Sequence, residues 1–142
     1  MQEISNILAT FHDGGIEDFE GNYSELELKI GCTYLAEIEK EGNEYFFLTI
    51  TDVNRFEFHH WNGTVTKDLK EIIELDLEIG YSKVEDGIAK TSCNVWIKEE
   101  GDSGGELWIE AKYRDLKNQD REPMEPETLY ELSKTYWNRT NE

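Results

Sequence analysis

The sequence predicts a mainly β or α+β domain, with a curved antiparallel sheet or sandwich-like meander of about seven strands and a C-terminal helix. Two observations predict this class. Short segments of alternating apolar and polar residues recur through residues 15–113, and turn signals rich in Gly, Asn and Asp separate them. Helical spacing of apolar residues marks the two ends, 1–11 and 126–137. A small closed β-barrel is the alternative arrangement of the same strands.

The chain is expected to form a single domain over residues 1–142. With 142 residues, of which 12% are aromatic, it can bury a core without disulfides or a metal. Residues 1–11 are predicted to form a short helix or an irregular lead-in, and 15–113 the antiparallel β body. Pro126 and an early acidic residue predict a helix over 126–137.

The longest alternating pattern runs from Leu26 to Ile38, where every even position is apolar or small. A period of two is the signature of a half-buried strand, so the pattern predicts one long central strand. Gly31 lies at its middle and is predicted to bend it, because a glycine inside a strand pattern commonly marks a bulge.

The other strands are delimited by turn signals, among them Gly21-Asn22, Asp52 to Asn54 and Asp86-Gly87. Segment 64–71 is ambiguous, although Leu69, Ile72 and Ile73 could lie on one helical turn. The remaining strands are predicted at 16–20, 45–53, 55–61, 74–84, 88–98 and 106–113.

The net charge of −18 comes from 32 acidic against 14 basic residues. Nucleic acids and anionic membrane surfaces carry charge of the same sign, so neither is an expected partner. The negative charge would attract a basic protein partner. The alternative is that the acidic surface only keeps the chain soluble. No apolar run approaches bilayer-spanning length and the N-terminus lacks signal-peptide features, so a cytoplasmic location is expected.

Cysteine and histidine chemistry is sparse. Cys32 and Cys93 lie in the apolar phase of predicted strands without a second Cys at metal spacing, so both are predicted to be buried free thiols. His12-Asp13 is predicted to be a turn, since a metal phosphohydrolase site needs further His and Asp ligands. His59 and His60 are adjacent on a strand, so they should face opposite sides and cannot chelate one ion together.

No catalytic signature is found. Ser24, Ser92 and Ser103 lie in no nucleophile-elbow pattern, and no glycine-rich phosphate cradle follows a strand. The acidic loops 85–87 and 99–106 could attract a hard cation but lack the spacing of a helix-loop-helix calcium site. The sequence therefore predicts no enzyme, no metal and no cofactor.

Tryptophans among acidic residues are the best candidates for a functional surface. Trp108, together with Trp96 or Trp61, falls out of phase with its apolar neighbours and is expected to be exposed. An exposed tryptophan ringed by acids is typical of a hot spot for a basic partner. The predicted partner-binding residues are Trp61, Glu99, Glu100, Asp102, Glu106 and Trp108.

The run Phe11-His12-Asp13-Gly14-Gly15-Ile16, followed by an alternating strand, an acidic β-rich body and a closing helix, resembles the immunity-protein-like families of bacterial polymorphic toxin systems. The specific part of the resemblance covers residues 11–32. It implies a cytoplasmic inhibitor that binds and blocks a toxin domain, and it brings no catalytic residues. The alternatives are a barrel-like carrier of a small apolar ligand and, behind it, a metal-dependent hydrolase at His12, Asp13 and His59 or His60.

Overall fold

The computed structural model describes residues 1–95 and 103–140, which form one antiparallel sheet and four helices. The mainly β class with a C-terminal helix is therefore confirmed. The helices are α1 (Gln2–Thr10), α2 (Thr33–Glu39), α3 (Leu69–Glu74) and α4 (Pro126–Thr140). The strands are β1 (Gly15–Gly21), β2 (Glu25–Gly31), β3 (Tyr45–His60), β4 (Val65–Thr66), β5 (Leu77–Glu85), β6 (Ile88–Val95), β7 (Ser103–Lys117) and β8 (Pro123–Met124).

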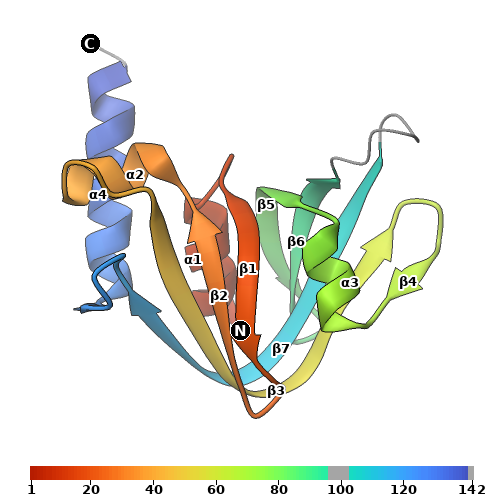
Figure 1. The fold of residues 1–142 in the computed structure, drawn as a ribbon. Coiled ribbons are helices and arrows are strands. Elements are labelled where there is room, and N and C mark those ends of the chain that lie inside the picture. The colour runs from red at the N-terminus through yellow and green to blue at the C-terminus, as the bar shows by residue number, and fades with distance from the viewer. Residues whose placement is uncertain (96–102, 141–142) are drawn as a thin grey trace.

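The sheet returns on itself through its two longest strands. Its order is β4-β3-β2-β1-β5-β6-β7-β8, and β3 also pairs with β7, from Phe47 opposite Lys117 to His60 opposite Gly105. β2 pairs with the first part of β3, and β6 pairs with the first part of β7. The ring thus has two wings (Figure 1): a first wing of β1, β2, the start of β3 and the end of β7, and a second wing of β5, β6, the end of β3 and the start of β7.

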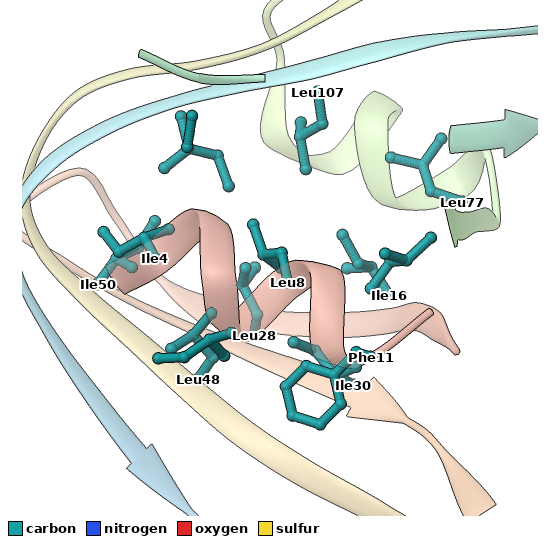
Figure 2. Close-up of a cluster of buried hydrophobic side chains, with 14 of the residues drawn as sticks. Ile4, Leu8, Phe11, Ile16, Leu28, Ile30, Leu48, Ile50, Leu77 and Leu107 are labelled. Carbon is teal, nitrogen blue, oxygen red and sulfur yellow. The ribbon is translucent and has the colours of Figure 1, made fainter. Parts of the chain in front are cut away.

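Helix α1 fills the space between the wings, as Figure 2 shows. Its apolar residues Ile7, Leu8 and Phe11 are completely buried, and the ring of Phe11 lies 5.2 Å from that of Phe46. They pack against Leu28, Ile30, Leu48, Ile50, Leu77 and Leu107 from both wings. The helical spacing read from residues 1–11 therefore supplies the centre of the core.

The predicted strand from Leu26 to Ile38 is wrong beyond Gly31. β2 ends at that glycine, and α2 begins directly after Cys32. Cys32, Leu35 and Ala36 are all buried, at i, i+3 and i+4. The segment thus satisfies a helical period as well as a period of two, and tertiary packing selects the helix.

The predicted turn at Asp52 to Asn54 is also wrong, because β3 continues through it to His60. Asp52 has a φ of 53°, and the pairing with β7 shifts register between Val53 and Arg55. This is a β-bulge, which takes up an extra residue and bends a strand without ending it. Asn54 is the extra residue, and Asp52 is of a residue type that tolerates the left-handed conformation it adopts just before the bulge.

Most other boundaries follow the sequence. The turns at Gly21 and at Asp86-Gly87 join paired antiparallel strands, and all three residues have positive φ. The ambiguous segment before β5 forms α3, whose Asp68 side chain accepts a hydrogen bond from the Glu71 amide (3.0 Å). Consequently β5 begins at Leu77, later than predicted. The end of the strand predicted over 88–98 lies outside the described residues. No helix in the described parts of the chain is long and apolar enough to cross a membrane.

Candidate functional site

The outer face of the second wing brings together the predicted residues that the structure describes. Glu106 and Trp108 are two residues apart on β7, so they share a face with Gly104. Trp61 follows β3, donates its amide N–H to the Gly104 carbonyl (3.0 Å), and places its indole where a Cβ on Gly104 would lie 3.0 Å from Nε1. Trp61, Glu106 and Trp108 therefore form one row, here called the tryptophan row. Glu99, Glu100 and Asp102 lie outside the described residues.

The two tryptophans differ in their surroundings. Trp61 is 67% exposed. The prediction that Trp108 is exposed is wrong, because His59 and Lys90 lie against its indole and leave it half-buried. On one side the imidazole of His59 stacks on it, with ring centroids 3.5 Å apart, and on the other the Lys90 ammonium lies 4.1 Å from the ring centroid. The indole N–H donates to Glu106 (3.3 Å). Trp108 is thus held in one position, and Trp61 is available for contact.

Two buried charges flank Trp108. Glu57 and Lys90 are 8% and 7% exposed, and in the described ranges no other Asp, Glu, Lys or Arg is buried. Glu57 accepts hydrogen bonds from Arg55 (2.7 Å) and His59 (2.8 Å), and Lys90 donates to Glu85 (2.8 Å). Buried charges are tolerated when they are paired in this way.

The ionisation of Glu57 is fixed by these contacts. Burial alone would raise the pKa of its carboxyl. The hydrogen bonds from His59 and Arg55, together with their positive charge, outweigh burial and lower the pKa below its ordinary value. The carboxylate therefore stays ionised and anchors the two side chains beside Trp108.

Sequence reasoning found Trp108 but missed its neighbours. Arg55, Glu57 and His59 alternate with the buried Phe56 and Phe58, a period of two that places them together on the outer face. That signal was present in the sequence. The approach of Lys90 from β6 depends on the pairing of β6 with β7, which no local pattern reveals.

The known proteins give no further guide to this surface. Comparison of the chain with protein-family models, with curated proteins and with solved structures found no match. The chemistry of the tryptophan row and its neighbours is therefore the guide to function.

The His12-Asp13 motif forms the predicted turn and connects three elements. Asp13 has a φ of 70° and donates its amide N–H to Ile79 of β5 (2.9 Å). A Cβ on Gly14 would lie 2.7 Å from the Gly31 carbonyl oxygen, so only glycine fits this close approach. The imidazole of His12 stacks on Tyr81, at 5.2 Å between ring centroids. The motif thus joins α1 to β1 and β5.

The three histidines lie in separate environments. His59 belongs to the outer face, whereas His60 lies on the side of Phe58 (4.8 Å between centroids) and contacts Thr66 (2.8 Å). His12 is at the turn after α1. Within residues 1–95 and 103–140, no three His, Cys, Asp or Glu side chains are arranged to hold a metal ion.

Both cysteines are buried free thiols, as predicted, although Cys32 precedes α2 and does not lie in a strand. Burial raises the pKa of Cys32 to about 11 and that of Cys93 to about 12. Because the thiolate is the reactive form, we expect neither cysteine to react with Ellman's reagent in the native protein at pH 7.5 within minutes. Both should react in denaturant. Rapid native labelling of either thiol would contradict this burial.

Proposed function

We propose that this chain is a non-enzymatic, acidic protein-binding domain whose partner is a basic protein, and that it serves as an immunity protein that neutralises a basic toxin. The observation that carries the proposal is Trp61, an exposed tryptophan beside Glu106 on a strongly acidic protein. The suggestion that this partner is a toxin comes from the resemblance of residues 11–32 to immunity-protein-like families.

The charge supports a cationic partner. The chain carries a net charge of −18, and of the acidic residues that the structure describes only Glu57 is buried. The negative charge therefore lies at the surface, where it raises the local concentration of a basic protein and speeds encounter. It also opposes binding to other acidic surfaces.

The tryptophan row supports a protein partner. Tryptophan is enriched among the few interface residues that contribute most of the binding energy. Trp61 offers a large apolar surface, and Glu106 offers a carboxylate for a basic side chain of the partner. The fixed Trp108 behind them reduces the side-chain entropy lost on binding.

The contacts in the structure do not support the two alternative functions, a carrier of an apolar ligand and a metal-dependent hydrolase. A carrier of an apolar ligand would need space inside the ring, and α1 occupies the region between the wings. A hydrolase would need His12 and Asp13 in one site with His59 or His60. The three histidines have different neighbours, however: His12 stacks on Tyr81, His59 stacks on Trp108, and His60 contacts Thr66.

We expect Trp61→Ala to weaken binding of the basic partner by about 30-fold or more, the loss typical of a hot-spot residue. The measurement is biolayer interferometry with the basic proteins encoded by neighbouring genes. Tyr113→Ala is the control, because Tyr113 is, like Trp61, a strongly exposed aromatic residue (64%) but lies away from the tryptophan row on β7. An equal loss in both variants would contradict a specific role of Trp61.

The electrostatic part of the proposal is tested by salt. The association rate should fall steeply between about 50 mM and 500 mM NaCl, because the Debye length beyond which charge steering is screened shortens from roughly 14 Å to roughly 4 Å over this range. A rate indifferent to salt, or no binding to any of these basic proteins, would refute the proposed function.

A further inference from the structure

The outer face of the first wing contains a second surface feature, a groove made of two adjoining hollows of about 200 Å³ and 390 Å³. Both hollows are lined by Glu20, Glu27 and Arg121, so they form one continuous depression, here called the first-wing groove. The aromatic rings of Tyr45 and Phe47 also lie on this outer face and line it. It lies at the start of β3 and the end of β7, whereas the tryptophan row lies at the end of β3 and the start of β7.

The groove is built from two adjacent rows of outward side chains that cross four strands. One row is Asp18, Lys29, Phe47 and Lys117, and the other is Glu20, Glu27, Thr49 and Asp115. Glu20 and Glu27 stand directly opposite each other on β1 and β2. Like charges in this position repel and destabilise a sheet, so the pair favours a cation beside it.

That cation is at present an arginine of the same chain. Nη1 of Arg121 lies 2.8 Å and 3.0 Å from the two carboxylate oxygens of Glu27. The guanidinium carbon lies 4.0 Å from the centroid of the Phe47 ring. The hydrogen bond to Glu27, assisted by the charge of Glu20, raises the pKa of Arg121. The groove therefore binds a guanidinium between carboxylates and an aromatic ring, the arrangement that favours arginine over a point charge.

Arg121 is poorly anchored elsewhere. It is in the short connection between β7 and β8, has a φ of 64°, and its side chain is 51% exposed. An exposed ion pair of this kind contributes little to stability. Glu25 and Asp115 line the larger hollow and form no ion pair within the described residues. These two carboxylates add negative charge to the same hollow, which favours another cation in place of Arg121.

We infer that the first-wing groove binds an arginine side chain of a basic protein, in the position over Phe47 that Arg121 now occupies, and that Arg121 acts as a tethered competitor. The identity of the guest rests on the proposed function, since a basic partner supplies the arginine. The chemistry of the groove can be tested separately, with a peptide.

The test is a ¹⁵N NMR titration with the peptide acetyl-Gly-Arg-Gly-amide. A tethered competitor acts at millimolar effective concentration, so Arg121→Ala should bind this peptide at least about fivefold more tightly than the wild type. The amide shifts should map to β1, β2 and the start of β3. A citrulline peptide, which has the same shape without the charge, should bind at least about fivefold more weakly than the arginine peptide.

Two further variants complete the design. Glu27→Gln, added to Arg121→Ala, should abolish the gain, and Glu20→Gln replaces it if that variant fails to fold. Lys40→Ala is the matched control, because it removes one positive charge and breaks an exposed ion pair with Asp120 in the same β7–β8 connection. It should leave peptide binding unchanged.

The inference is overturned if Arg121→Ala binds the peptide no more tightly than the wild type, if citrulline binds as well as arginine, or if the shifts map to the tryptophan row. These outcomes are distinct from failure of the proposed function. If basic proteins bind and Trp61→Ala weakens them while the groove variants do not change peptide binding, the groove is refuted and the proposed function stands. Peptide binding without any basic protein partner supports the groove and refutes the proposed function.

Discussion

Phe11→Ala is expected to lower the free energy of unfolding by about 3–5 kcal/mol, the range for truncation of a fully buried aromatic side chain. Phe11 is 0% exposed, ends α1 and packs against Phe46 of the first wing. Its loss would leave a cavity where the helix meets the sheet. The measurement is urea unfolding followed by tryptophan fluorescence.

The size of this effect follows from the position of α1. The two wings are joined along β3 and β7. At their other edges, β1 and β5 are paired in the described residues through one residue pair, Gly15 opposite Glu78. The helix packs against both wings, so its apolar side chains stabilise a closure that few sheet hydrogen bonds support.

Two control variants test whether the loss at Phe11→Ala comes from the buried volume that is removed. Phe11→Leu keeps most of the buried volume and should cost less than half as much as alanine. Tyr113→Ala removes an exposed aromatic side chain and should change the stability by about 0.5 kcal/mol or less. A loss below about 1 kcal/mol for Phe11→Ala would show that α1 does not organise the core.

Local patterns predicted much of this fold. The helical spacing around Ile7 and Leu8, the glycine turns and the start of α4 at Pro126 are each decided by neighbours in sequence, and the structure has them in place. Where a pattern fits two periods, as at Cys32 to Ala36, only the tertiary contacts decide. The bulge between Val53 and Arg55 shows the same limit, because Asp and Asn residues that predict a turn are also compatible with a bulge inside a continuous strand.

The ring itself could not be predicted, because it depends on the long-range pairing of β3 with β7. The same pairing builds the surface around Trp108. Alternation along β7 is enough to place Glu106 and Trp108 on one face, but His59 and Lys90 reach the indole from β3 and β6. The faces of Glu106, Trp108 and Glu57 can thus be predicted from alternation along their own strands, whereas the approach of Lys90 cannot.

Glu57→Gln is expected to lower the free energy of unfolding at pH 7 by about 1.5–3 kcal/mol, the worth of a hydrogen bond to a charged group. The amide keeps the shape of the side chain but removes the charge that Arg55 and His59 share. Glu41→Gln, at an exposed position in the connection after α2, is the control and should change stability by about 0.5 kcal/mol or less.

The contribution of Glu57 to stability depends on pH. The folded-state pKa of Glu57 is lowered from its ordinary value near ~4.3, so its ionised form stabilises the fold fully above that value. The contribution disappears as the pH falls through the lower, folded-state pKa. The stability difference between wild type and Glu57→Gln should therefore be large at pH 7 and should narrow below about pH 4.

The same variant separates a structural from a functional role of the buried charges. If Glu57 holds His59 against Trp108, Glu57→Gln should alter the tryptophan fluorescence of the folded protein as well as its stability. Trp108→Phe should remove that fluorescence change, because Trp108 is the tryptophan on which His59 stacks. A stability difference that stays constant down to pH 3 would instead mean that the neutral side chain serves as well as the carboxylate, and that the charge beside Trp108 is not what positions it.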